Sequence, residues 1–345
     1  MRRLLPLWIL FFAGLLLLAE LVLRMPAVQA ALPKPEPTLW HAEMIEYKLE
    51  YLKKFAASHD LDVLFVGNST TQAGVDPTVF DTERNLSAGA GSFNASIEGL
   101  PPAGLLTFLK IYLRYVQPQH VVIGLSAQDL NSNSPWAKDV TDRVKASPLA
   151  MAEAREGWLG QVLAFALDHS VLFRYRNLLH QFVVRGGQLA PASNVYFDDR
   201  GFDPIDRSLA SFSASEALQL QNRAGVLNYD AGGLQLQSLK QTIQLLQEQG
   251  IDVVLVNMPL ADGYYRNFDK PEDYDRYLAA LHQVAEQFDV PVLDMESLPA
   301  ELAFGDAEFA DFNHLNATGA QRLTALIADY FAAGAEQHVA NTTRP

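Results

Sequence analysis

The sequence predicts an α/β protein, a three-layer sandwich with a central parallel sheet, preceded by one N-terminal transmembrane or signal helix. Short apolar runs alternate with helical segments along the chain, which is typical of strands joined by crossover helices. The run at residues 61–66 is apolar except for Asp62, as expected of a strand that is buried on both faces. Residues 4–23 form an apolar stretch with Glu20 as its only charge, and this stretch predicts the N-terminal helix.

The N-terminal stretch also predicts where the protein resides. It is about 20 residues long, which is enough to cross a bilayer as a helix. Arg2 and Arg3 precede it and favour a cytoplasmic N-terminus, with the rest of the chain outside. We therefore expect a membrane-anchored, extracytoplasmic protein, in the periplasm or on the outer face of the cytoplasmic membrane. Small residues ending at Ala30 offer a cleavage site as the alternative, and cleavage there would release a secreted protein.

The chain divides into four expected regions. Residues 1–25 are the anchor or signal peptide, and residues 26–40 are a stem stiffened by Pro33, Pro35 and Pro37. Residues 41–335 are the α/β domain, and residues 336–345 are a tail. Residues 133–227 interrupt the strand–helix alternation and are interpreted as an insertion over the carboxyl edge of the sheet. This insertion is either a substrate cap or ordinary peripheral structure.

Local patterns predict each element in order. Apolar residues at helical spacing predict helices over residues 41–55, 105–116, 159–167, 171–184, 234–249, 274–288 and 319–333. Apolar runs predict strands over residues 61–66, 121–125, 251–256 and 290–293, and Asn85, Leu86 and Ser87 are expected to end a further strand. Parallel sheets place their sites at the carboxyl ends of strands, where Ser69, Gln128 and Met258 fall.

Composition excludes several classes of function. The net charge of −14 leaves no basic patch of the kind that binds nucleic acid, so we expect no nucleic-acid partner. The chain has no cysteine, which excludes thiolate metal sites, cysteine nucleophiles and disulfides. We expect neither a cofactor nor a metal.

Two short segments at opposite ends of the domain carry the chemistry. Ser69 follows the first strand in the segment LFVGNST, and Asp311 and His314 lie three residues apart in the segment DFNHLN. A serine hydroxyl is a weak nucleophile until a base takes its proton and a third group orients that base. Asp311 and His314 can face one side of a helical turn, so that the carboxylate holds one ring nitrogen while the other faces Ser69.

These segments resemble blocks of the SGNH (GDSL) hydrolase superfamily. Gly67, Asn68 and Ser69 resemble its first block, with Asn68 where aspartate is usual, and Asp311 to His314 match its last block, Asp-x-x-His. The sequence resembles the branch of membrane-anchored envelope proteins that includes the D-alanyl-lipoteichoic acid biosynthesis protein and polysaccharide O-acetylation factors. The resemblance covers about residues 60–335 in scattered blocks. It implies that Ser69 is the nucleophile, His314 the general base and Asp311 the orienting carboxylate.

The resemblance also implies an oxyanion hole. Besides the N–H of Ser69, the second block supplies a glycine N–H, for which Gly89 and Gly91 are the two candidates. The third block normally supplies an asparagine side chain, and Gln128 stands at that place here. Glutamine donates the same N–H from a longer arm, and Asn131 is the alternative donor. Asn68, Asn131 and Met258 are expected to contact the substrate.

The leading functional hypothesis is an ester hydrolase or O-acyltransferase that acts on cell-envelope glycans through an acyl-Ser69 intermediate. The expected partners are an ester-bearing or acyl-accepting glycan, the membrane through the N-terminal helix, and, as a candidate, a membrane-bound acyltransferase. The alternative is a non-catalytic glycan-binding or assembly component that keeps the fold. The departures at Asn68 and Gln128 favour this alternative, and the intact Ser69, Asp311 and His314 favour the enzyme.

Overall fold

The computed structural model describes residues 5–31, 41–154, 157–184, 186–187, 197–212 and 222–342. The chain forms two compact units, one of Met1–Trp40 with Ala146–Val195 and one of His41–Lys145 with Tyr196–Pro345. The boundary between the units therefore falls inside the predicted insertion at residues 133–227. The predicted proline stem at Pro33, Pro35 and Pro37 lies outside the described residues.

The first unit is helical. It contains α1 (Leu5–Leu23), α2 (Pro26–Ala31), α9 (Pro148–Ala154), α10 (Gly157–His169), α11 (Val171–Arg174) and α12 (Arg176–Val184). Glu20 near the end of α1 accepts hydrogen bonds from the Ser170 hydroxyl at 2.8 Å and from the N–H groups of Val171 and Leu172 at 2.9 Å. The helix predicted over residues 171–184 is broken at Tyr175, between α11 and α12. Of the helices in the described residues, none has the length and apolarity needed to span a membrane. The N-terminal anchor stays a prediction.

The second unit is built on a five-stranded sheet, as the sequence predicts. Its strands are β1 (Asp60–Val66), β2 (Ala90–Asn94), β3 (His120–Leu125), β4 (Asp252–Asn257) and β5 (Val292–Asp294). Their spatial order is β2-β1-β3-β4-β5, and every neighbouring pair is parallel. In a sheet of this order, the connections from β1 and from β3 lead to opposite edges of the sheet. Ligands bind between the carboxyl ends of these two strands.

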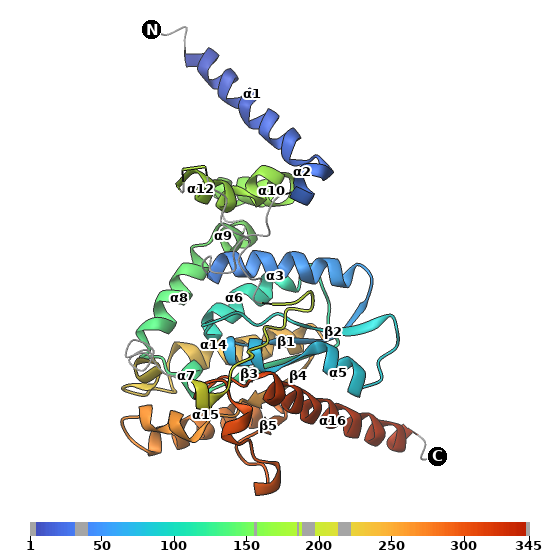
Figure 1. Ribbon diagram of the computed structural model, residues 1–345, viewed down its shortest axis with the longest axis vertical. Helices are drawn as coiled ribbons and strands as arrows, with labels where there is room; N and C mark the ends of the chain where they lie inside the picture. The colour runs from blue at the N-terminus through green and yellow to red at the C-terminus, as the bar shows by residue number, and fades with distance from the viewer. Residues whose placement is uncertain are drawn as a thin grey trace. The chain divides into compact units, whose positions relative to one another are not determined.

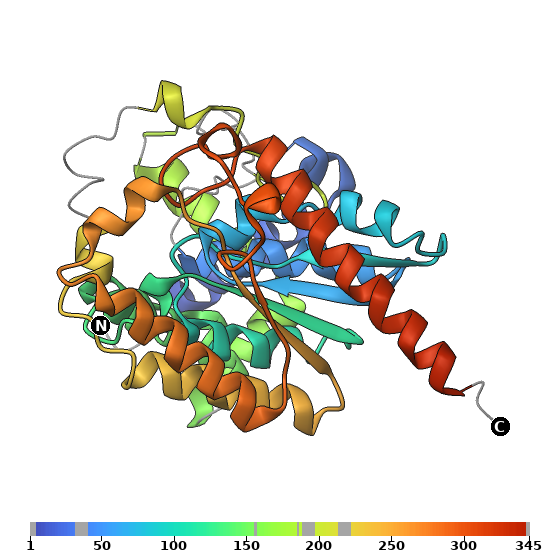
Figure 2. The same ribbon diagram turned by 90° about the horizontal axis from the view of Figure 1, so that it is seen from below.

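Helices cover both faces of the sheet and complete the three layers (Figures 1 and 2). On one face lie α4 (Ser69–Gly74), α5 (Pro77–Glu83) and α16 (Ala317–Thr342), and on the other lie α6 (Pro102–Tyr112), α14 (Leu234–Glu248) and α15 (Glu272–Phe288). Alternate strand residues such as Val63 and Phe65 pack against Leu323 and Ile327 of α16 in one buried cluster. The helix α3 (His41–Ala56) lies outside α6. The Tyr112 hydroxyl of α6 donates to the Ile45 carbonyl of α3 at 2.8 Å.

Short helices connect the remaining segments. These are α7 (Ala127–Leu130), α8 (Pro135–Lys145) and the 3₁₀ turns η1 (Leu209–Ser211), η2 (Asp262–Asn267), η3 (Ala300–Leu302) and η4 (Asp306–Glu308). The prediction that Asn85, Leu86 and Ser87 end a strand is wrong. They form the turn before β2, where Asn85 has a φ of 49°, a left-handed conformation that asparagine tolerates better than most residues. The last helix also continues past the predicted end at residue 333 to Thr342.

Candidate active site

The predicted nucleophile, Ser69, lies where β1 turns sharply into α4. Val66 ends the strand, and Ser69 is the first residue of the helix. Gly67 leaves room for this turn, because a Cβ atom there would lie 2.3 Å from the Thr71 Oγ1 atom and 2.6 Å from the Gly124 carbonyl oxygen. The N–H of Ser69 opens the helix and has no acceptor one turn before it within α4, so it is free to bond a ligand.

The structure brings Ser69, His314 and Asp311 together in one hydrogen-bonded chain. The Nε2 atom of His314 lies 2.8 Å from the Ser69 Oγ atom, and its Nδ1 atom lies 2.8 Å from Asp311 Oδ1. Ser69 comes from the carboxyl end of β1, whereas the other two residues come from the loop before α16. With Nδ1 held by the carboxylate, Nε2 is the nitrogen that can accept the serine proton.

Asp311 is held as a carboxylate. Burial alone would raise the pKa of Asp311, but the hydrogen bond and positive charge of the His314 ring hold that pKa well below its ordinary value. The N–H groups of Asn313 and His314 also donate to Asp311 Oδ1, at 3.2 and 3.0 Å. The tight loop from Asp311 to His314 therefore fixes the carboxylate and orients the imidazole.

Asn68 has a structural role, so the prediction that it contacts substrate is wrong. Its side chain is buried, and its Oδ1 atom accepts from the N–H and the hydroxyl of Thr70, both at 2.7 Å, which caps α4. Its Nδ2 atom donates to both carboxylate oxygens of Asp129, at 2.7 and 2.8 Å. The amide thus ties the turn after β1 to the turn after β3.

Asp129 is a residue that the sequence analysis missed. Its carboxylate also accepts from the N–H of Ser126 at 2.7 Å and from the Ser126 hydroxyl at 3.0 Å. Burial raises the pKa of Asp129 to about 6. A second carboxylate at position 68 would face this buried acid directly, which explains why an amide stands there. The signal available in the sequence was Ser126 three residues before Asp129, the spacing of a capping box.

The predicted glycine donors, Gly89 and Gly91, lie at the wrong end of the sheet. Gly91 pairs with Leu61, and the Gly89 carbonyl accepts from the N–H of Asp60, both at the amino end of β1. Ser69 follows the other end of the same strand, so neither glycine can reach an oxyanion there. The error follows from the misplaced second strand.

Gly99 is the glycine on the correct edge. The chain leaving β2 runs beside the turn after β1, where the N–H of Ile97 donates to the Gly67 carbonyl at 3.1 Å. The N–H of Glu98 donates to the Gln72 side chain on α4 at 3.1 Å. Gly99 follows with a φ of 64°, a conformation that favours glycine. The signal in the sequence was that Gly99 follows the strand β2, whereas Gly89 precedes that strand and Gly91 lies within it.

Two further predictions of substrate contact are wrong, at Asn131 and Met258. Asn131 is buried, and its amide donates to the carbonyls of Gly225 and Leu227 at 3.0 Å, so its hydrogens are already used. Met258 is buried in the cluster beneath α16, where its methyl group faces Gly74. A position at a strand end places a residue near the site but does not decide where its side chain points.

Gln128 lies on the same edge of the sheet as Ser69, and its role as an oxyanion donor stays a prediction. It lies in α7, directly after β3, and its Oε1 atom accepts a long hydrogen bond of 3.4 Å from the Tyr264 hydroxyl. This contact orients the amide so that the Nε2 hydrogens face away from Tyr264.

We expect Gln128→Ala to lower kcat for ester hydrolysis by about 10²- to 10³-fold, because one donor to the oxyanion is lost. The melting temperature should stay close to that of the unchanged protein, since Gln128 is only half-buried. Asn131→Ala is the control, and it should lower the melting temperature because the buried Gly225 carbonyl and the partly buried Leu227 carbonyl lose their donor. If Gln128→Ala leaves kcat unchanged, Gln128 does not donate to the oxyanion.

The described residues contain no cluster of three or more His, Asp or Glu side chains that could hold a metal ion. No family model matches the sequence, and no curated protein matches it.

Solved structures that resemble this chain include three bacterial proteins. A lipase/acylhydrolase from Enterococcus faecalis is 16% identical with a TM-score of 0.38, over 78% of this chain and 94% of its own. A GDSL-like lipase from Bacteroides thetaiotaomicron is 12% identical with a TM-score of 0.42, over 84% and 99%. An acetylxylan esterase from Geobacillus stearothermophilus, solved as a catalytic mutant, is 12% identical with a TM-score of 0.37, over 78% and 93%. At these identities and TM-scores the similarities assign neither family nor function, which must be argued from the site itself.

Proposed function

We propose that this protein is an extracytoplasmic serine ester hydrolase or O-acyltransferase that acts on cell-envelope glycans through an acyl-Ser69 intermediate. One observation carries the proposal of ester chemistry. The Ser69 hydroxyl, the His314 ring and the Asp311 carboxylate form one chain with two contacts of 2.8 Å. Serine, imidazole and carboxylate in this order are the parts needed to activate a hydroxyl at neutral pH.

In the first half of the reaction, the Ser69 oxygen attacks the ester carbonyl while His314 Nε2 takes the hydroxyl proton. Asp311 holds Nδ1 and balances the charge of the imidazolium that forms. We assign the oxyanion to the N–H groups of Ser69 and Gly99 and to the Gln128 amide. The intermediate then collapses, its C–O bond to the leaving alcohol breaks, and the imidazolium returns the proton to that alcohol.

In the second half, a hydroxyl group attacks the acyl-Ser69 ester and His314 takes its proton. The new C–O bond forms, the bond to Ser69 breaks, and the proton returns to the serine oxygen. Water as the attacking group gives hydrolysis, and a sugar hydroxyl gives acyl transfer. The two reactions use the same residues, so the acceptor alone distinguishes them.

The glycan substrate and the location rest on sequence features. The blocks around Ser69 and His314 resemble those of envelope O-acetylation factors, which supports an acyl-bearing or acyl-accepting glycan as substrate and a membrane-bound acyltransferase as partner. Arg2 and Arg3 before an apolar stretch support an outward-facing domain.

Labelling by a fluorophosphonate tests the proposed chemistry. The probe should label the unchanged protein on Ser69 and should leave Ser69→Ala unlabelled. Ser87→Ala, which removes an exposed hydroxyl in the turn before β2, should label normally. If the unchanged protein is not labelled and does not hydrolyse p-nitrophenyl acetate, the enzyme proposal fails and the non-catalytic glycan-binding component takes its place.

Cell fractionation tests the proposed anchor. The full-length protein should pellet with membranes and resist extraction by carbonate, because the apolar stretch from Leu4 to Leu23 is about long enough to span a bilayer. A shortened protein starting at Thr38 should remain in the supernatant. Release of a mature chain beginning at Ala31 would instead establish cleavage of a signal peptide.

A further inference from the structure

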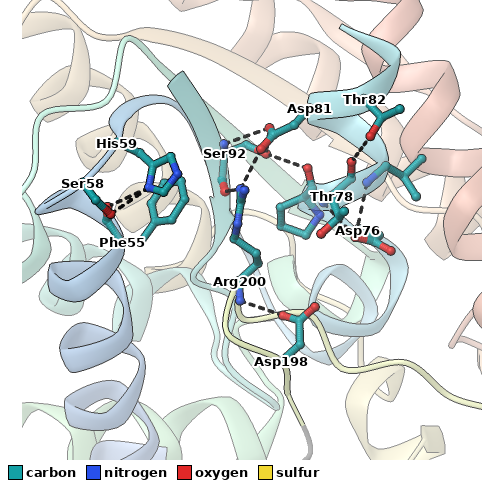
Figure 3. A network of polar contacts seen from close by, with 12 residues as sticks. Phe55, Ser58, His59, Asp76, Thr78, Asp81, Thr82, Ser92, Asp198 and Arg200 are labelled. Carbon is teal, nitrogen blue, oxygen red and sulfur yellow. Dashed lines mark hydrogen bonds and ion pairs between the residues drawn. The ribbon is translucent and has the colours of Figure 1, made fainter. Parts of the chain in front are cut away.

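Residues 197–212 form an irregular segment that we call the strap, and it begins at the edge strand β2. The N–H of Asn94 donates to the Arg200 carbonyl at 2.8 Å. The Arg200 side chain donates to Asp81 at 2.6 Å and to the Ser92 carbonyl at 3.0 Å, as Figure 3 shows. A Cβ atom at Gly201 would lie 2.0 Å from the Asn94 carbonyl oxygen, so this close approach requires glycine. The start of the strap is therefore fixed to the sheet.

From β2 the strap crosses α4 and then follows the loop that carries the catalytic acid and base. The N–H of Asp203 donates to the Gln72 carbonyl at 3.2 Å, and the Gln72 amide donates back to the Asp203 carboxylate at 3.0 Å. Further along, the N–H of Ala317 donates to the Ile205 carbonyl at 3.1 Å. The N–H of Leu209 donates to the Phe309 carbonyl at 2.7 Å. These contacts flank Asp311 and His314 on both sides.

Arg207 lies between these two contacts and reaches the catalytic carboxylate. Its Nη2 atom donates to Asp311 Oδ2 at 2.5 Å, and its Nε atom donates to the Ala310 carbonyl at 3.2 Å. The guanidinium carbon also lies 4.9 Å from the centre of the Phe212 ring. The His314 ring uses the other oxygen, Oδ1, so the two carboxylate oxygens have separate partners.

We propose that Arg207 is a positioning residue, through which the strap orients Asp311 and with it the His314 ring. This inference rests on the proposed ester chemistry at Ser69. The Asp311 side chain is only 5% exposed, so Arg207 supplies a fixed donor to an oxygen that is largely shielded from solvent. Without Arg207 the carboxylate is free to turn, and the imidazole loses its fixed orientation toward Ser69.

The test compares Arg207→Gln with a matched arginine far from the site. Arg276 pairs with the buried Asp273 at 2.9 Å and is 54% exposed, close to the 48% of Arg207, so Arg276→Gln is the control. For p-nitrophenyl acetate, Arg207→Gln should lower kcat about tenfold with little change in KM, because orientation and not binding is lost. Arg276→Gln should change neither.

Arg207→Lys tests the geometry of this contact. Its ammonium keeps the charge but cannot hold Oδ2 and the Ala310 carbonyl together as the guanidinium does, so kcat should recover only in part. Melting temperatures identify any variant that does not fold.

The chemical shifts of the His314 ring, followed by NMR in the full chain, are a readout that does not need activity. They should change in Arg207→Gln and stay unchanged in Arg276→Gln, because only Arg207 holds the carboxylate that orients the ring. A change in a protein that hydrolyses no ester would support Arg207 while overturning the proposed function. Unchanged ring signals and equal kcat in Arg207→Gln and Arg276→Gln would overturn the role of Arg207.

Discussion

Ser69→Ala should lower kcat for p-nitrophenyl acetate by about 10⁴- to 10⁶-fold, and His314→Ala should do the same. In the proposed reaction the serine oxygen bonds to the acyl group, and the imidazole, 2.8 Å away, accepts its proton. Because the two act in one step, the double variant should be no slower than either single variant. Single-turnover and steady-state hydrolysis rates measure these effects.

Asp311→Asn extends the same experiment to the third residue. It should lower kcat by about 10⁴-fold at neutral pH, because an amide in place of the carboxylate favours the wrong tautomer of His314. His282, an exposed histidine on α15, provides the control, and His282→Ala should hydrolyse the ester at the normal rate. Retention of most activity in Ser69→Ala would contradict the assigned nucleophile.

Asn68→Asp should lower the free energy of unfolding by about 3 to 5 kcal/mol. This loss is expected although aspartate is the usual residue in the SGNH block that the segment resembles. The new carboxylate would face Asp129, whose oxygens now accept from Asn68 Nδ2 at 2.7 and 2.8 Å. Both residues are buried, so water cannot screen the repulsion. Urea denaturation at pH 8 measures the loss.

Exchanging the two residues should recover most of that stability. In the double variant Asn68→Asp with Asp129→Asn, the amide at position 129 would donate to the new carboxylate. Its oxygen would occupy the place of Asp129 Oδ2, which accepts from the N–H and the hydroxyl of Ser126. A double-mutant cycle should therefore show a large favourable coupling. A coupling near zero would mean that the contact between positions 68 and 129 contributes little.

The loss in the single variant Asn68→Asp should depend on pH. Burial already raises the pKa of Asp129 to about 6, and a neighbouring carboxylate would raise the pKa of the pair further. An acid with a raised folded-state pKa costs stability above that pKa, and the cost disappears as pH falls and the acid is protonated. The variant should therefore approach the stability of the unchanged protein as the pH falls from 8 to about 5. A deficit that is constant over this range would exclude charge repulsion as its cause.

The sheet and the serine–histidine–aspartate chain were accessible from the sequence because their signals are local. The strands at β1, β3 and β4 are apolar runs, and Ser69 and His314 lie in short blocks with a recognisable order. The strand β2 was missed because it is only five residues long and carries the buried polar residues Ser92 and Asn94, which conceal its apolar character. Gly89 and Gly91 were wrongly assigned to the oxyanion hole because that assignment depended on the position of this strand.

The remaining site residues depend on long-range contacts that no local pattern contains. Asp129 meets Asn68 across 61 positions, and Arg207 meets Asp311 across 104. Met258 directly follows β4 as expected, and Asn131 follows α7, but only the folded chain shows that their side chains turn into the interior. Position along a strand predicts proximity to a site, whereas side-chain direction depends on packing.

The separation of Ser69 from His314 by 245 positions has a consequence for the newly made chain. Synthesis at about 5 to 20 residues per second places roughly 10 to 50 s between the two residues. During that interval the emerging protein carries a serine with no base, so the proposed ester chemistry cannot begin. A truncated protein that ends anywhere before Asp311 would be equally inactive. The order of the residues along the chain thus delays activity until synthesis is nearly finished.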